Sequence, residues 1–343
     1  MTLPTPRAPF DGPVPALRWG VIGAGGIAGR FVDAVRAHTG QQVVAVAARS
    51  AERATAFATT HQVPRACTPA ELLGDPAVDV VYVATPHNVH AEWAIAAAAA
   101  GKHVLVEKPI ATSADEARTI TAAARAAGVL VMEAMWTRYL PQFDILRHLL
   151  ADGALGDVVG VAADFGFAAP YDPSSRMRSP DLAGGALLDA GVYPISFASA
   201  VLGPPSTVSA VGRKLTNGVD LYASAVLGAA TGAAAHITTS IVAELPTRAT
   251  VVGTTARLEF RRPFYAPTEL VLTRRQDGRA VTETWTDDAF TDPYSGLSHE
   301  ATALAGYVAE GRVESPVHPH EETIAVLATI EQVRAQLTVV DGP

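Results

Sequence analysis

The sequence predicts an α/β protein with a doubly wound first domain and an α+β second domain built on a large, mostly antiparallel open sheet. Three observations predict it. A glycine-rich turn follows the first apolar run, strand-like and helix-like runs then alternate as far as Glu133, and strand-like runs dominate after Tyr139. We expect a flexible tail over residues 1–16, the first domain over 17–136 and the second over 137–343.

The first element is an apolar strand, Leu17–Ile22, and the turn after it reads Gly23-Ala24-Gly25-Gly26-Ile27-Ala28. This is the G-x-G-x-x-A form of the dinucleotide-binding fingerprint of Rossmann domains. Gly23 makes the tight turn, Gly25 lets the backbone approach a pyrophosphate, and Ala28 permits close packing of helix on strand. The helix expected over 26–38 directs its free N–H groups at the phosphates.

The next strand, expected over 42–47, suggests which dinucleotide binds. About 20 residues after the fingerprint, an NAD enzyme places an acid against the ribose 2′-hydroxyl. Here the chain reads Ala48-Arg49-Ser50. Because a guanidinium and a hydroxyl can bind a 2′-phosphate and no carboxylate repels it, we expect NADP(H) in preference to NAD(H).

The rest of the first domain continues the alternation and completes a six-stranded sheet. Capping boxes at Thr68–Glu71 and Ser113–Glu116 mark two helix starts. The further strands are expected at residues 79–84, 103–107 and 129–133. The further helices are expected at residues 51–60, from 69 onwards, at 88–100 and at 114–128.

The second domain starts with a helix over 141–150. Strands are expected at residues 158–167, 207–214, 222–227, 233–241, 249–252, 257–260, 270–273 and 281–285. Further helices are expected at residues 184–202, 298–310 and 319–336. An open sheet needs a cover for its outer face, so we expect a homodimer or a higher homo-oligomer formed sheet to sheet.

Composition limits the possible partners and compartment. The formal net charge of -8 argues against nucleic-acid binding, and the alanine-rich helices carry too many charges to span a membrane. Cys67 is the only cysteine, and the proline-rich start has no apolar signal-peptide core, so we expect a cytoplasmic protein. We expect no metal, because no acid or cysteine accompanies His87 and His90.

Three further motifs resemble those of the Gfo/Idh/MocA oxidoreductases. They are Ala84-Thr85-Pro86-His87 with His90, Glu107-Lys108-Pro109, and the run GGALLDAGVY over 184–193. Together with the fingerprint they extend the resemblance over nearly the whole chain. Within the family, the run MEAMWTRY over 132–139 is most similar to the dimeric dihydrodiol dehydrogenases and the related NADP-dependent D-xylose dehydrogenases.

The resemblance implies the members of the site. It implies that Lys108, Tyr193 and Asp189 are catalytic, and it suggests a cis Lys108–Pro109 bond, which the sequence alone leaves open. The resemblance also adds cofactor-binding residues to the fingerprint and to the pair Arg49 and Ser50. These further residues are Thr85, Pro86, His87, His90, Glu107 and Lys108. For His90, packing or capping is the alternative role.

The residues themselves agree with this chemistry. Lys108 follows a parallel strand, at the edge where doubly wound folds bind ligands. Asp189 and Tyr193 are four residues apart on one expected helix, so they share a face. Hydride transfer at a carbonyl needs a proton partner at the oxygen, and a tyrosine serves when a nearby cation lowers its pKa. Many family members carry histidine where this chain has Tyr193.

The substrate is expected to be a sugar, a polyol or a cyclic diol, contacted by Tyr193. Trp136 offers an aromatic face and Arg138 hydrogen bonds to substrate oxygens. Phe165 is a further wall, with ordinary core packing as the alternative. The competing function is a dinucleotide-binding sensor that keeps the fold without chemistry. The set of Lys108, Asp189 and Tyr193 favours an enzyme, because a sensor has no need of it.

Overall fold

The structure is a computed structural model that describes residues 3–7, 10, 12–170, 172 and 175–341. The chain forms two compact units, each made from separate stretches of sequence. The six-stranded unit comprises Ala8–Leu140 and Phe290–Thr323. The nine-stranded unit comprises Met1–Arg7, Pro141–Ala289 and Ile324–Pro343.

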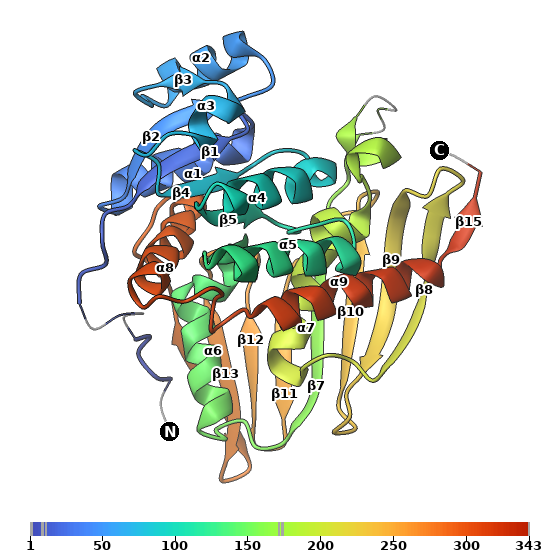
Figure 1. Cartoon of the computed structure of the whole chain (residues 1–343). Helices are drawn as coiled ribbons and strands as arrows, with labels where there is room; N and C mark the ends of the chain where they lie inside the picture. The colour runs from blue at the N-terminus through green and yellow to red at the C-terminus, as the bar shows by residue number, and fades with distance from the viewer. Residues whose placement is uncertain (1–2, 8–9, 11, 171, 173–174, 342–343) are drawn as a thin grey trace. The chain divides into compact units, whose positions relative to one another are not determined.

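These units differ from the expected domain boundaries in one segment. Residues 290–323 were expected in the second domain, but they belong to the six-stranded unit. The reason is α8 (Leu297–Ala309), an apolar helix that packs on α1 (Gly26–His38). In Figure 1 this orange-red helix lies beside the blue start of the chain.

The segment expected as a flexible tail, residues 1–16, makes contacts where the structure describes it. The N–H of Arg7 donates to the Asp144 carboxylate at 2.8 Å. Phe10 packs edge-on against Tyr307, with ring centroids 5.5 Å apart. Part of this segment is therefore held by side-chain contacts.

All neighbours in the sheet of the six-stranded unit are parallel, in the order β3-β2-β1-β4-β5-β6. This is the strand order of the Rossmann fold. The strands are β1 (Arg18–Ile22), β2 (Gln42–Ala47), β3 (Ala66–Cys67), β4 (Val80–Val83), β5 (His103–Glu107) and β6 (Val131–Ala134). The predictions for β2 and β5 are confirmed residue for residue, and the carboxyl ends of β1, β4 and β5 bring three predicted motifs to one edge.

The helices of this unit follow the expected starts. The capping box at Thr68 is complete, whereas Ser113 caps the N–H of Glu116 and the Glu116 carboxylate accepts from Thr112 instead. The α-helices besides α1 and α8 are α2 (Ala51–Thr60), α3 (Pro69–Leu73), α4 (His90–Ala99) and α5 (Ala114–Ala127). The short 3₁₀ turns are η1 (His87–Val89), η2 (Trp136–Tyr139) and η6 (Pro293–Gly296).

The nine-stranded unit contains one mixed sheet in the order β14-β13-β12-β11-β7-β10-β9-β8-β15. Its neighbours are antiparallel except for the pairs β7–β10 and β8–β15. The strand β15 was not among the expected strands, because its three residues are too few to show an alternating pattern. The strands are β7 (Val158–Gly166), β8 (Thr207–Leu215), β9 (Asp220–Gly228), β10 (Ala234–Ser240), β11 (Ala249–Gly253), β12 (Ala256–Phe260), β13 (Leu270–Gln276), β14 (Arg279–Trp285) and β15 (Thr338–Val340).

Helices lie along one face of this sheet (Figure 1). They are α6 (Pro141–Ala151), α7 (Val192–Leu202) and α9 (His320–Ala335), the last shared with the other unit over its first turn. The segment Pro180–Leu202, which is not one of the alanine-rich helices, is apolar and long enough to cross a membrane by length and composition. It is 72% buried, and α7 packs on β7, β10 and β11, which is also the pattern of a core helix.

Candidate active site

The glycine-rich turn after β1 has the geometry of a phosphate-binding loop. Gly23 has φ +120°, and a Cβ there would lie 2.2 Å from the Ala84 carbonyl oxygen, so only glycine fits. Gly25 precedes α1 without a side-chain cap, and a Cβ on Gly25 or Gly26 would meet nothing within 4 Å. The chain itself does not need glycine at these two positions. The open space and uncapped N–H groups therefore suit a pyrophosphate.

Ile27 and Ala28 continue the fingerprint with opposite exposures. Ala28 is fully buried against the sheet, as its packing role requires. Ile27 is 36% exposed at the first turn of α1.

The loop between β2 and α2 holds the residues expected to select the cofactor. The Arg49 side chain is exposed, and neither an ion pair nor a hydrogen bond engages it within the described chain. The Ser50 hydroxyl caps α2 by accepting from the N–H of Arg53 and donates to Glu52 at 2.6 Å. The Ser50 hydroxyl thus already has two hydrogen-bond partners. The Glu52 carboxylate beside it was not among the expected features of this loop.

The loop after β4 carries Thr85, Pro86 and His87 at the same sheet edge as the glycine turn. The Thr85 hydroxyl is buried and has no hydrogen-bond partner in the described part of the chain, which leaves it available to a bound dinucleotide. His87 is 7% exposed, and its ring lies 5.5 Å from that of His90. Within the described residues, no group of three histidine, cysteine or acidic side chains could hold a metal.

His90 is enclosed and serves the backbone. It is 0% exposed, its Nδ1 lies 2.8 Å from the Pro109 carbonyl oxygen, and its Nε2 lies 2.9 Å from that of Thr85. Both ring nitrogens are therefore engaged by the protein. This environment favours packing, the alternative role of His90, and direct contact with the cofactor stays a prediction.

Lys108 leaves the carboxyl end of β5 in a turn whose Lys108–Pro109 bond is cis. Glu107 points into the unit, where its carboxylate accepts hydrogen bonds from the Tyr82 hydroxyl and, at 3.2 Å, from the N–H of Lys108. Burial raises the pKa of Glu107. Glu107 thus supports the turn from inside, and its direct contact with the cofactor stays a prediction.

Tyr193 stands near the start of α7, in the nine-stranded unit. A π-helical turn, Leu187–Gly191, leads directly into α7. The buried Asp220 carboxylate fixes this turn by accepting from the N–H of Leu187 at 2.5 Å and from Arg334 at 3.0 Å. A Cβ on Gly191 would approach Thr239 to 3.1 Å, so glycine allows the turn to lie close to β10.

Two aromatic rings lie against that of Tyr193 within this unit. Its ring centroid lies 5.6 Å from Phe165 and 5.0 Å from Tyr265. Phe165 and Tyr265 stack on each other at 4.5 Å. Phe165 was an expected site residue, whereas Tyr265 was missed, since it lies in an irregular segment with no periodic pattern.

Asp189, one helical turn before Tyr193, has a partner that the sequence did not reveal. Its Oδ1 accepts from Arg176 Nη2 at 2.7 Å. The two residues are thirteen positions apart across a loop, a separation with no helical or strand periodicity to signal it. The ion pair holds Asp189 in place beside the aromatic group.

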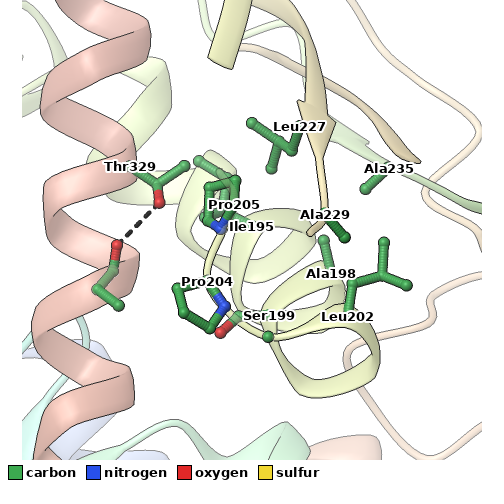
Figure 2. A pocket seen from close by; sticks show the side chains of 12 residues that line it. Ile195, Ala198, Ser199, Leu202, Pro204, Pro205, Leu227, Ala229, Ala235 and Thr329 are labelled. Carbon is green, nitrogen blue, oxygen red and sulfur yellow. Dashed lines mark hydrogen bonds between the residues drawn. The ribbon is translucent and has the colours of Figure 1, made fainter. Parts of the chain in front are cut away.

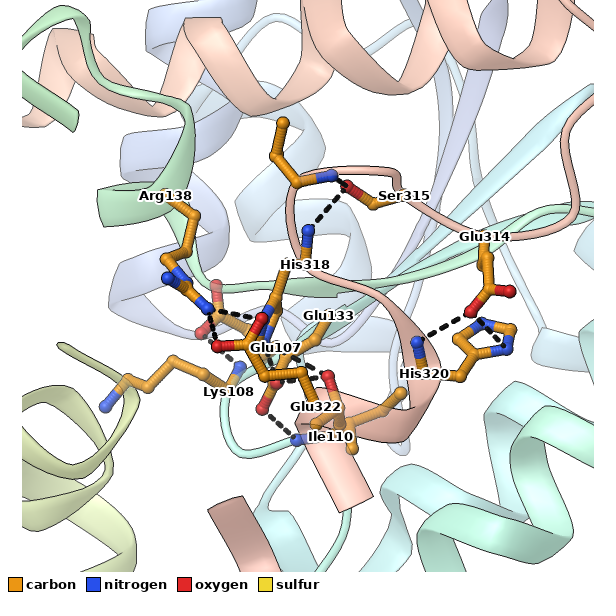
Figure 3. A network of polar contacts seen from close by, with 12 residues as sticks. Glu107, Lys108, Ile110, Glu133, Arg138, Glu314, Ser315, His318, His320 and Glu322 are labelled. Carbon is orange, nitrogen blue, oxygen red and sulfur yellow. Dashed lines mark hydrogen bonds and ion pairs between the residues drawn. The ribbon is translucent and has the colours of Figure 1, made fainter. Parts of the chain in front are cut away.

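Two expected substrate residues have other roles in the structure. Trp136 is 4% exposed and stacks parallel to Tyr294 at 6.2 Å. Arg138, also 4% exposed, forms an ion pair with Glu322 and lies 3.3 Å from His318 (Figure 3). Because its guanidinium is buried and paired with Glu322, Arg138 has a structural role here, and its contact with substrate oxygens stays a prediction.

A pocket in the nine-stranded unit lies beside the far end of α7 (Figure 2). Its walls are mostly apolar and include Ala198, Leu202 and Leu227, with Thr329 contributed by α9. The enclosed space holds about one water molecule. The pocket is therefore too small for a sugar or a diol.

Comparisons with known proteins identify the family. Residues 17–135 match the family described as "Oxidoreductase family, NAD-binding Rossmann fold", and residues 143–259 match the GFO/IDH/MocA C-terminal domain. Human trans-1,2-dihydrobenzene-1,2-diol dehydrogenase is 37% identical over 329 residues, covering 94% of this chain and 98% of the human protein. The chain belongs to the Gfo/Idh/MocA family. The rabbit protein of the same name is 38% identical over 326 residues, covering 93% of this chain and 98% of its own length.

Solved structures agree with this family assignment. KijD10, a 3-ketoreductase from Actinomadura kijaniata solved with NADP and TDP-benzene, has a TM-score of 0.82 and 31% identity, covering 96% of this chain and all of its own. A levoglucosan dehydrogenase solved with NADH and levoglucosan has a TM-score of 0.82 at 24% identity, covering 94% of this chain and 98% of its own, and shows the fold alone. This Gfo/Idh/MocA protein is therefore an oxidoreductase with a Rossmann domain for a nicotinamide cofactor.

Proposed function

We propose that this oxidoreductase interconverts a CH–OH group and a carbonyl on a sugar, a polyol or a cyclic diol, using NADP(H). The observation that carries the proposal is the environment of Tyr193, whose ring lies among aromatic side chains with the ion-paired Asp189 one turn away. Aromatic faces suit the apolar face of a ring-shaped substrate, and the carboxylate suits its hydroxyls. The name of the similar human dihydrodiol dehydrogenase supports a cyclic diol within this substrate class.

The dinucleotide has a site that fits it. The turn at Gly23 and Gly25 and the start of α1 would hold the pyrophosphate, and the Thr85 hydroxyl would supply a further hydrogen bond. When bound, the nicotinamide exchanges a hydride with the substrate carbon. The exposed Arg49 and the absence of an acid at Ala48 support NADP(H), while Glu52 opposes it.

Each catalytic residue has one task in this proposal. Tyr193 exchanges the proton with the substrate oxygen, and Lys108 supplies the positive charge that favours loss of that proton. Asp189, held by Arg176, binds a neighbouring substrate hydroxyl. KijD10 has been solved with a lysine replaced and with a tyrosine replaced, which are the residue types proposed here.

The test begins with the substrate. Purified protein is assayed with NADP⁺ and NAD⁺ against pentoses, hexoses, inositols and trans cyclic diols. Tyr193→Phe and Lys108→Met should each lower kcat by about 10²–10⁴-fold on the best substrate, the usual contribution of a positioned acid or base, with cofactor affinity nearly intact for Tyr193→Phe. The double variant should lose much less than the product of the two losses.

Tyr222→Phe is the matched control, because it removes a hydroxyl from the same unit outside the aromatic group. It should retain wild-type kcat. If Tyr193→Phe retains it too, with hydride transfer rate-limiting, the proton comes from another group. If the folded protein binds NADP⁺ and oxidises none of these substrates, a sensor becomes the better assignment.

We also propose that the protein is cytoplasmic and acts as a homodimer. The single cysteine, Cys67, suits a reducing compartment. The uncovered face of the nine-stranded sheet is the surface through which two copies would associate.

A further inference from the structure

Glu133 is a buried carboxylate at the carboxyl end of β6, next to the strand that carries Lys108. Its side chain is 2% exposed. One oxygen accepts from the N–H of Ile110 at 2.9 Å. The other accepts from His318 Nε2 at 2.8 Å and from the Thr323 hydroxyl at 3.0 Å (Figure 3). Both oxygens are thus satisfied, and one of them holds the backbone two residues after Lys108.

His318 links this carboxylate to a second ion pair. Its Nδ1 lies 3.7 Å from Glu322 and 3.3 Å from Arg138, and Arg138 and Glu322 contact each other. Burial lowers the pKa of His318, but the neighbouring carboxylates of Glu133 and Glu322 outweigh this and raise it. The Nε2 atom of the ring donates to Glu133, and Nδ1 faces the Arg138–Glu322 pair.

The four groups are paired with one another. The carboxylates of Glu133 and Glu322 face the Arg138 guanidinium and the His318 ring, whose raised pKa favours a positive charge beside them. Desolvation alone would raise the pKa of Glu133. The hydrogen bond from His318 has the opposite effect, and the net pKa is lowered, which keeps the carboxylate ionised. Charges taken out of water are tolerated when they are paired and hydrogen-bonded, as all four are here.

We propose that Glu133 and His318 position Lys108 for the reaction by clamping the turn that follows it. The turn is held on both sides, since the Pro109 carbonyl contacts His90 and the Ile110 N–H contacts Glu133. Neither Glu133 nor His318 is a catalytic residue. This inference rests on the proposed function, because it concerns the lysine assigned there.

The experiment measures the turn and the reaction separately. Glutamine in Glu133→Gln has one uncharged acceptor oxygen, so it can accept from Ile110 or from His318 but not from both. The amide hydrogens of residues 107–112 should therefore exchange at least about 10-fold faster, as measured by mass spectrometry. The kcat should fall by about 10-fold, with substrate KM changing less than twofold. Other groups near the turn, Glu107 and His90, are unchanged.

The conservative variant tests the same link from the other side. His318→Gln keeps a donor for Glu133 and should retain both slow exchange and at least a third of kcat, whereas His318→Leu should behave like Glu133→Gln. Glu71→Gln is the matched control, because Glu71 also accepts a backbone N–H, from Thr68, far from this turn in the sequence. It should change neither readout.

Two results would overturn the proposal. One is unchanged exchange over 107–112 in folded Glu133→Gln, and the other is faster exchange with wild-type kcat. Should Glu133→Gln fail to fold, His318→Leu compared with His318→Gln decides the question. If Lys108→Met keeps wild-type turnover, the proposed function fails, and the exchange result still reports whether the clamp exists.

Discussion

Among single residues, Glu300 stands out because it is a fully buried carboxyl whose two oxygens have no hydrogen-bond partner in the described part of the chain. It lies in the first turn of α8. Burial raises the pKa of Glu300 well above its ordinary value, and the negative charge of Glu107 raises it further. The folded protein therefore keeps Glu300 protonated at pH values where the unfolded chain ionises it.

Glu300→Gln should accordingly stabilise the protein at high pH. Since the folded state binds the proton more tightly, wild-type stability is full below the unfolded pKa, about 4.3, and falls as pH rises, by up to ~1.4 kcal/mol per pH unit. Glutamine does not ionise, so the variant should gain a few °C in Tm over wild type at pH 8 and nearly nothing at pH 4.5. Scanning calorimetry at both pH values, with exposed Glu92→Gln as control, checks this. Equal gains at both pH values would mean that Glu300 is ionised in the folded protein.

Among the elements, the loop between β2 and α2 is the one that we expect to select between the two dinucleotides. Arg49→Ala should selectively weaken NADP⁺ binding by about 1.5–3 kcal/mol, the range for a charged hydrogen bond, with little effect on NAD⁺. Ala48→Asp should weaken NADP⁺ by repulsion and improve NAD⁺. Calorimetric titration measures both, with the surface variant Arg118→Ala as control. Wild-type protein that binds NAD⁺ at least as tightly as NADP⁺ would contradict our interpretation of this loop.

Elements with local signals were predictable from the sequence. Apolar periodicity, glycine stops and capping residues gave α1, β2, α2 and β5 with their observed bounds, because each signal acts within a few residues. The pairing of β15 with β8 was not predictable. It joins two short stretches about 125 residues apart, and a three-residue strand has too few positions to show alternation.

The candidate site divides in the same way. The glycine turn, Lys108 and Tyr193 are visible as motifs, since their roles follow from residue type and local spacing. Arg176, Tyr265 and Glu133 act through neighbours that only the fold brings together. The ion pair of Arg138 with Glu322 was not predictable either, because the two residues are 184 positions apart in the sequence.

For the whole molecule, the open question is what covers the free face of the nine-stranded sheet. Strand register places three valines on this face. Val211 of β8 pairs with Ser224 of β9, and Val226 lies two residues further along β9, so the two valines point to the same side of the sheet. Val252 of β11 pairs with Gly160 of β7 on that side. They are 71%, 41% and 39% exposed. Apolar side chains spread over an uncovered sheet favour association with a second copy.

The protein should therefore be a dimer at about 10 µM by multi-angle light scattering, and Val211→Lys with Val226→Lys should shift it towards monomer by placing charges in the interface. Val339→Lys is the control. This valine is 55% exposed but lies on the opposite face of the sheet. Its neighbour Thr338 pairs with Arg213, which is on the same face as Val211, and successive residues of a strand point to opposite faces. A monomeric wild type, or a double variant that stays dimeric, would exclude this face as the interface.

The return of residues 290–323 to the six-stranded unit also sets the order of events during synthesis. Glu133 is made 185 residues before His318, its ionic partner. At ~5–20 residues per second, the ribosome needs about 10–40 s to cover that distance. Until then the unit lacks the ring that hydrogen-bonds one oxygen of Glu133. The six-stranded unit therefore cannot complete its fold until residues 290–323 have been made, after the strands β7 to β14 of the other unit.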